Sequence, residues 1–126
     1  MYKFALSTVA LGILALSAQP VSAQMPTAAE GRPITLTASV VDLSCNTVFG
    51  LAGADHRMCA QVCFDLGIPL ALLGENGILY VPVTMAMGQE RGDKDLRGHA
   101  EHTVTVTGKV ISRGGLNTIL IESISM

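Results

Sequence analysis

The sequence predicts an all-β domain with one short helix, arranged as a small five-stranded antiparallel barrel. Apolar and polar residues alternate in several short segments, which is typical of half-buried strands. A single segment has the apolar spacing and end signals of a helix. The resulting core is too small for a sandwich, so we expect the strands to close into a barrel. A small α+β sheet with the helix packed on one face is the alternative.

The first predicted strand starts at Pro33 and ends near Asp42 or Cys45. Its apolar face follows period two, through Ile34, Leu36, Ala38 and Val40. We expect residues 46–53, which include two glycines, to form a loop.

One helix is predicted from about His56 to Leu66. Asp55 precedes it as an expected N-cap, because a carboxylate can accept from the free amides of the first turn. Gly67 is the expected C-terminal stop, since glycine readily adopts the left-handed conformation that ends many helices.

Two short strands are then expected, at 70–73 and 78–83. Asn76 and Gly77 lie between them, and an Asn-Gly pair is a strong signal for a tight hairpin. The polar stretch 85–102 follows, with Glu90–Lys94 and Arg91–Asp95 as expected pairs on a helical turn.

The last two strands are predicted at 103–112 and 118–125, joined by a glycine-rich turn. Gly108 interrupts the first of them, which favours a bend or bulge of the kind that small closed barrels use. With five bent strands, the closest barrel type is the OB-like barrel, a five-stranded Greek key.

The N-terminal residues 1–23 have the pattern of a signal peptide. Lys3 supplies a positive start, residues 4–18 are apolar, and Val21-Ser22-Ala23 is a small-x-small cleavage pattern. We therefore expect a periplasmic or secreted protein, with residues 24–32 as a flexible lead-in and 33–126 as the barrel domain. No later stretch predicts a membrane span.

The charge balance argues against nucleic-acid binding. The chain has eight Lys and Arg against ten Asp and Glu, and removal of Lys3 with the signal peptide makes the remainder more acidic. Nucleic acids are negatively charged and bind basic surfaces, so we expect no nucleic acid among the partners.

Three sequence segments resemble small exported bacterial OB-fold-like proteins with a cluster of cysteines and a histidine. The matching segments are Val40 to Cys45, His56 to Pro69 and Thr105 to Val110. The resemblance covers nearly all of the predicted mature chain. It implies the barrel fold more firmly than it implies an activity.

The candidate functional residues are Cys45, His56, Cys59 and Cys63. His56, Cys59 and Cys63 share one face of the predicted helix, and Cys45 can approach from the end of the first strand. Three thiolates and one imidazole are a standard tetrahedral zinc set, and soft thiolates also suit copper. The sequence therefore predicts a site for copper or zinc, used to handle or deliver the ion.

A disulfide is the competing interpretation. Cys59 and Cys63 are one helical turn apart and too distant to bridge, so the bond would join Cys45 to Cys59 or to Cys63. Closing such a loop stabilises a small domain by about 3 kcal/mol. The protein would then be a disulfide-stabilised, non-catalytic interaction module with a partner protein in the periplasm.

The sequence gives little support for an enzyme with a reactive cysteine. A reactive cysteine beside His56 would need an orienting acid and an oxyanion hole, and no motif supplies them. We therefore expect no enzyme activity. The sequence leaves open whether four further residues take part as metal ligands, and these are Met85, Met87, His99 and His102.

Overall fold

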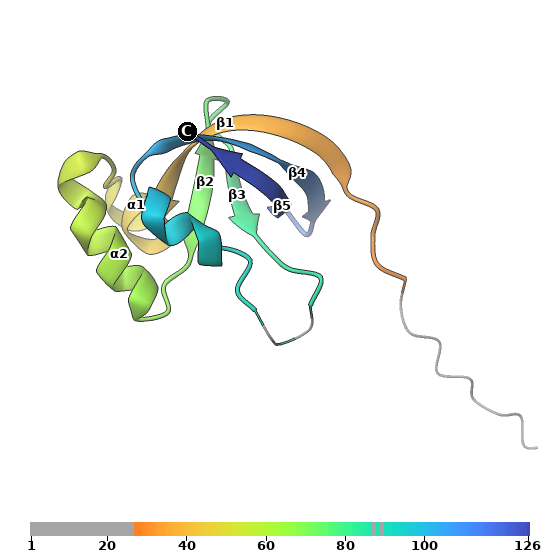
Figure 1. Cartoon of the computed structure of the whole chain (residues 1–126), viewed down its shortest axis with the longest axis horizontal. Helices are drawn as coiled ribbons and strands as arrows, with labels where there is room; N and C mark the ends of the chain where they lie inside the picture. The colour runs from red at the N-terminus through yellow and green to blue at the C-terminus, as the bar shows by residue number, and fades with distance from the viewer. Residues whose placement is uncertain (1–26, 87, 89) are drawn as a thin grey trace, which may run out of the picture.

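The computed structural model describes residues 27–86, 88 and 90–126 (Figure 1). The predicted signal peptide at 1–23 and the candidate ligand Met87 lie outside the described residues. The strands are β1 (Arg32–Asp42), β2 (Leu70–Gly74), β3 (Leu79–Pro82), β4 (Thr103–Arg113) and β5 (Leu116–Ser125). The helices are α1 (Leu43–Phe49) and α2 (Arg57–Asp65), and the 3₁₀ turns are η1 (Ala54–His56) and η2 (Lys94–His99).

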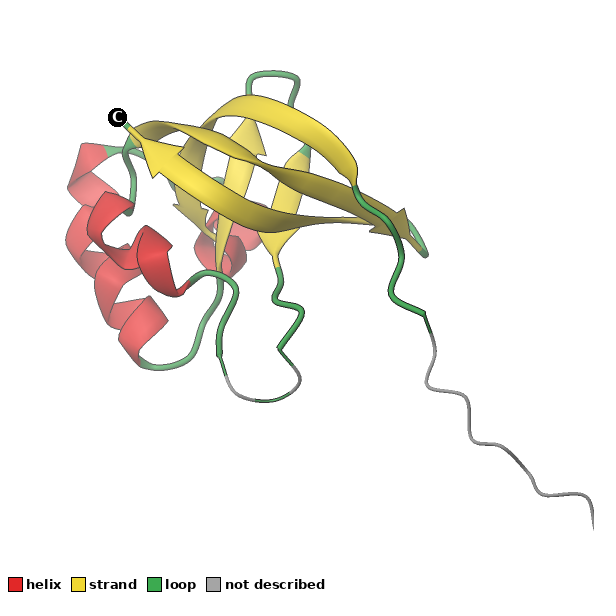
Figure 2. Cartoon of the chain, turned by 45° about the vertical axis from the view of Figure 1, so that its right-hand side comes forward, coloured by secondary structure: helices red, strands yellow, loops and turns green. Residues whose placement is uncertain are grey.

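The five strands form a closed barrel in the order β1-β2-β3-β5-β4 (Figure 2). This confirms the predicted small, mostly β, OB-like barrel. One detail differs from the prediction, because β3 and β5 pair in parallel while the other pairs are antiparallel. An odd number of strands in a closed ring cannot alternate in direction all the way round, so one parallel pair is unavoidable.

The core follows the period-two pattern read from the sequence. On β1 the buried side chains include Leu36, Ala38 and Val40, and on β4 they include Val104 and Val106. These positions face the inside of the barrel, because alternate residues of a strand point to the same side. The core thus forms from residues that the alternation identifies.

Gly108 marks the predicted irregularity in β4. The pairing of β4 with β5 shifts register between Thr107 and Gly108. A Cβ atom at Gly108 would overlap the carbonyl oxygen of Leu120. Glycine is therefore needed here because the backbone of β5 approaches β4 too closely for any side chain.

The first strand is followed by a helix, where the sequence predicted a loop. α1 starts directly after Asp42, whose side chain accepts a hydrogen bond from the amide of Cys45. It ends at Gly50, which has a left-handed conformation with φ of 67°. Both ends therefore carry ordinary helix signals, an aspartate N-cap and a glycine stop, although the helix has only seven residues.

The one predicted helix is present as η1 and α2 together. Its end is as expected, since Gly67 has a φ of 99°. The expected N-cap is wrong, because His56 occupies that position and no side chain caps the helix. The chain enters α2 through a 3₁₀ turn, so its first amides are not presented to Asp55.

The long polar stretch after β3 carries η2 and contacts α2 and the start of β2 through Arg91 and Asp93. The predicted pair of Lys94 with Glu90 is present at 2.8 Å. Arg91 pairs with Asp93 instead of Asp95, because η2 is a 3₁₀ turn that starts only at Lys94. Leu96 on η2 is fully buried and belongs to the core.

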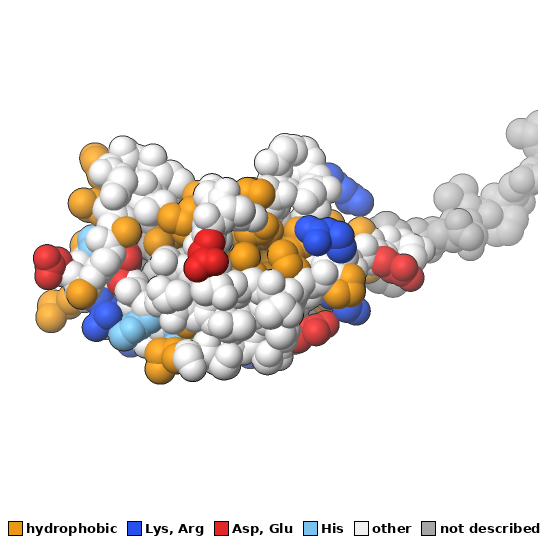
Figure 3. All heavy atoms as spheres, turned by 90° about the horizontal axis from the view of Figure 1, so that it is seen from above, with side chains coloured by type: hydrophobic (Ala, Val, Ile, Leu, Met, Phe, Trp, Pro, Cys, Tyr) orange, Lys and Arg blue, Asp and Glu red, His pale blue; other side chains and the backbone are white. Residues whose placement is uncertain are grey.

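All helices among the described residues are short. None of them has the length and apolar character needed to cross a membrane. Figure 3 shows one face of the molecule, on which acidic and basic side chains are scattered among apolar ones.

Candidate metal centre

The site lies where the end of β1 meets α1 and α2 (Figure 1). Asp42 is the last residue of β1, Cys45 is in the first turn of α1, and Cys63 is in the last turn of α2. Segments that are about twenty residues apart in the sequence thus bring three ligand-type side chains together.

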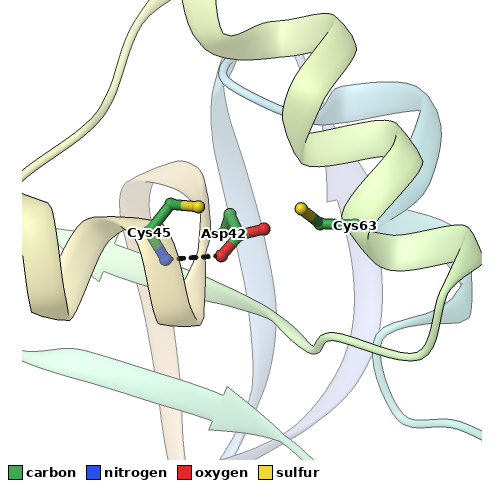
Figure 4. A group of neighbouring side chains, drawn as sticks. All are labelled: Asp42, Cys45 and Cys63. Atoms are coloured by element: carbon green, nitrogen blue, oxygen red, sulfur yellow. Dashed lines mark hydrogen bonds between the residues drawn. The ribbon is translucent and has the colours of Figure 1, made fainter.

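Asp42, Cys45 and Cys63 form a group that can hold a metal ion. One ligand atom from each residue lies within 4.8 Å of the ligand atoms of the other two. Figure 4 shows the carboxylate of Asp42 between the two sulfur atoms, both of which are turned toward it. The two thiols and one carboxylate therefore converge on a common space.

The carboxylate of Asp42 is fully buried and only half satisfied. Its Oδ1 accepts a hydrogen bond of 2.7 Å from the amide of Cys45, as the N-cap of α1. Its Oδ2 is also buried and has no hydrogen bond of regular geometry. Buried polar atoms are rarely left without a hydrogen-bond partner, so the unpaired Oδ2 of Asp42 is unusual.

The carboxylate of Asp42 contributes to a raised pKa of both thiols. Hydrogen bonding of the thiol to Asp42 is the largest cause that raises the pKa of Cys63 to about 12, and desolvation adds to it. A thiol is a weak donor, and Oδ2 of Asp42 has no partner at regular hydrogen-bond geometry, so the thiol of Cys63 does not fully satisfy this carboxylate. Burial and the charge of Asp42 also raise the pKa of Cys45. Without a cation, both groups are neutral thiols at neutral pH.

Cys59 belongs to the same neighbourhood but not to the tight group. It lies one helical turn before Cys63 and is exposed. Its thiol is close enough to contribute, by hydrogen bonding and by charge, to the raised pKa of Cys63. It approaches the site from the solvent side.

His56 is placed elsewhere. Its Nδ1 lies 2.9 Å from Oε1 of Glu101, and both side chains are buried. Glu101 Oε2 accepts a second hydrogen bond, of 2.7 Å, from the amide of Gly53. Of the four candidate ligands, the structure therefore groups Cys45 and Cys63 tightly, keeps Cys59 nearby and assigns His56 to a separate pair.

Of the other candidates, those that lie among the described residues do not join the group. Met85 is exposed on the loop after β3. His102 has its Nδ1 3.5 Å from the guanidinium of Arg57. His99 has a buried Nδ1 without a hydrogen-bond partner, but it is not part of the Asp42 group.

Asp42 is the residue that sequence reasoning missed. It appeared as the end of a strand, because the segment before it alternates regularly. The available signal was its position three residues before Cys45, which is the spacing of an N-cap and the amide that it accepts. Recognising the helix start would have placed this carboxylate beside the thiol.

The arrangement favours ion binding over nucleophilic catalysis. A catalytic cysteine needs a lowered pKa, whereas the pKa values of Cys45 and Cys63 are both raised. Zinc accepts cysteine sulfur and aspartate oxygen as ligands, usually in tetrahedral four-coordinate sites. Comparisons of the chain with protein-family models, with curated proteins and with solved structures give no match.

Proposed function

We propose that this chain is an exported, non-catalytic metal-binding protein that holds one soft or borderline metal ion. Asp42, Cys45 and Cys63 are the proposed ligands, with Cys59 as a fourth ligand from the solvent side. The observation that carries the proposal is the free, buried Oδ2 of Asp42 between two thiols. Export rests on the signal-peptide pattern at residues 1–23.

The buried carboxylate of Asp42 favours a cation at this site for electrostatic reasons. A buried carboxylate without a compensating charge is costly, and here the nearest groups are thiols that stay protonated. A divalent cation would displace the thiol protons and give the three anionic ligands a common counter-charge. Binding should therefore release protons and weaken as the pH falls.

The donor set favours zinc over copper. Copper(I) prefers sulfur ligands alone, whereas zinc accepts thiolate together with carboxylate oxygen. The sequence left both ions open, and the carboxylate of Asp42 is the feature that separates them. We infer that the ion is Zn²⁺ and that the protein handles or buffers it.

Titration of the reduced full chain with Co²⁺, a spectroscopic substitute for Zn²⁺, tests this proposal. We expect one ion per chain, with a sulfur-to-metal charge-transfer band, and displacement of Co²⁺ by Zn²⁺. Cys45→Ser and Cys63→Ser should each weaken binding by more than the roughly 10–100-fold typical of losing an outer-shell partner. Ser44→Ala, at an exposed position of α1, is the matched control.

The Asp42→Asn and Cys59→Ser variants define the rest of the set. Asp42→Asn should bind Co²⁺ more weakly, with the charge-transfer band of two thiolates retained, because only the oxygen ligand changes. Cys59→Ser should still bind one ion, with a smaller loss than Cys63→Ser. Unchanged affinity in both Cys45→Ser and Cys63→Ser would refute the site.

A second candidate function is the disulfide-stabilised interaction module. Two observations favour it. Cys45 and Cys63 are close enough for a small movement to join them, and several large apolar side chains are exposed on and beside α1 and α2. These are Val48, Phe49, Leu51, Met58, Val62 and Leu66. Exposed apolar groups of this kind often mark a protein interface. Thiol counting separates the two candidates, since the metal-binding form has three thiols and the disulfide form has one.

A further inference from the structure

The two sulfurs of the candidate site come from two different helices. Cys45 lies on α1 and Cys63 on α2, and their sulfur atoms are within 4.8 Å and turned toward the same space (Figure 4). A disulfide needs about 2.05 Å between the sulfurs, so one helix must approach the other by a few ångströms.

The helix that would move is α1, because it is weakly anchored. None of its seven residues is buried, so a small shift of α1 exposes or compresses no core side chain. The hydrogen bond from the amide of Cys45 to Asp42 Oδ1 joins α1 to β1 at the point about which α1 would turn. The N-cap can therefore be kept while the sulfur moves.

Cys59 and Cys63 cannot form a disulfide without unwinding α2, so a disulfide within the chain must include Cys45. Cys59 and Cys63 share α2, and residues four apart on a helix have Cβ atoms roughly 5–6 Å apart. That separation exceeds the span of a disulfide. Of the two partners that remain for Cys45, Cys63 belongs to the tight group and Cys59 does not, so we expect the bond to join Cys45 to Cys63.

We propose that the site is a redox switch, in which oxidation joins Cys45 to Cys63 and releases the metal ion. This inference rests on the proposed metal-binding function. A sulfur atom in a disulfide no longer carries the negative charge that binds the ion, so the metal-bound and disulfide forms exclude each other. Asp42 alone then remains of the tight group, and a single carboxylate does not retain zinc.

The chemistry is thiol–disulfide exchange with an external disulfide as oxidant. One thiolate of the pair attacks a sulfur of the oxidant, and one half of the oxidant leaves as a thiolate. The second thiolate of the pair then attacks the mixed disulfide and expels the other half. The two cysteines are oxidised by two electrons, the external disulfide is reduced to two thiols, and Zn²⁺ leaves without changing its oxidation state.

The test treats the zinc-loaded full chain with oxidised glutathione in the absence of oxygen. Zinc release is followed with a chromophoric chelator, and the intact mass is measured at each time. We expect release of one zinc per chain together with a mass loss of two hydrogens. Dithiothreitol should restore both the mass and zinc binding, and the chelator without oxidant is the control for spontaneous release.

Two variants identify the bond. Cys59→Ser retains only Cys45 and Cys63, so it should still lose two hydrogens and release the zinc that it holds. Cys45→Ser retains only the two cysteines of α2 and should form no internal disulfide. Trypsin cleavage after Arg57 separates Cys45 from the other two cysteines in the wild-type chain, so the bond appears as two joined peptides.

The failures of the two proposals are distinguishable. A chain that loads one zinc but gains only glutathione, with the zinc retained, overturns the switch and leaves the metal-binding function standing. A reduced chain that loads no zinc overturns the metal-binding function and the switch with it.

Discussion

The imidazole of His56 and the carboxylate of Glu101 form a buried pair that joins parts of the chain 45 residues apart, with 2.9 Å between Nδ1 and Oε1. Glu101 also binds the amide of Gly53, and its own amide donates to the carbonyl of Val40. It thereby ties the turn before α2 to β1 and to the entry of β4. Glu101 does so from a left-handed backbone conformation, with φ of 60°, which is unusual for a residue with a side chain.

His56→Ala should therefore destabilise the fold without removing the metal site. Loss of one partner from a buried hydrogen-bonded pair costs about 1–3 kcal/mol, because the remaining group stays buried without its partner. Urea unfolding of the metal-free chain measures this cost. Glu122→Ala, at an exposed position of β5, is the control and should change the unfolding free energy by less than about 0.5 kcal/mol.

The same His56→Ala variant separates two possible ligand sets. A site built on Asp42, Cys45 and Cys63 should still bind one Co²⁺ per folded chain. Loss of stoichiometric binding in a chain that remains folded would instead make His56 a ligand, as the sequence predicted.

Asp42→Asn should lower the pKa of Cys63. Hydrogen bonding to the Asp42 carboxylate, burial and the nearby negative charge, in that order, disfavour the thiolate and raise the pKa of Cys63 to about 12. Removing the charge brings the pKa back toward the ordinary value of 9.0. The rate of alkylation of Cys63 against pH, measured in the metal-free Cys45→Ser, Cys59→Ser background, reports this shift. An unchanged profile would show that Asp42 does not contact the thiol.

Arg91 should stabilise the fold more than its exposed position implies. It donates to both carboxylate oxygens of Asp93 and to the carbonyls of Phe64 and Ile68. Asp93 is buried and also accepts from the amide of Leu70, so Arg91→Ala leaves a buried carboxylate without its cation.

We expect Arg91→Ala to lower the unfolding free energy by about 3 kcal/mol, in the range of a broken buried pair. Lys94→Ala is the matched control, because its pair with Glu90 is exposed and should contribute less than about 0.5 kcal/mol. Equal effects of the two substitutions in urea unfolding would contradict this account of the loop.

Gly108→Ala should destabilise the barrel by about 2 kcal/mol or more, since it forces an overpacked contact with the backbone of β5. Gly98→Ala is the control, because a Cβ atom there meets nothing within 4 Å. Thermal unfolding of both variants compares the two positions. Similar midpoints would mean that β4 and β5 are farther apart than the structure places them.

The sequence predicts the barrel well because its strands alternate regularly and its turns contain glycine or Asn-Gly. Gly108, Gly77 and Gly67 each mark a backbone feature that is present. The parallel pairing of β3 with β5 could not be read in the same way, because it depends on how the ring closes. α1 was missed because it is short and has no buried face, so it leaves no apolar period in the sequence.

The candidate site could be predicted only in part from the sequence. Helical spacing correctly placed Cys59 and Cys63 on one helix. Cys45, expected to approach from the end of the first strand, lies close to Cys63. The same spacing could not show that His56 precedes α2 in a 3₁₀ turn and reaches Glu101. Nor could it show that Asp42 caps α1, since that contact depends on a helix that the pattern does not reveal.

The most direct test of the central claim is the native mass of the fully reduced chain with one equivalent of Zn²⁺, followed by its mass and thiol count after denaturation. We expect the native mass to include one zinc ion, with three thiols in the denatured chain. A bare native mass in the presence of equimolar zinc, with three thiols free to bind it, would contradict the metal site formed by Asp42, Cys45 and Cys63.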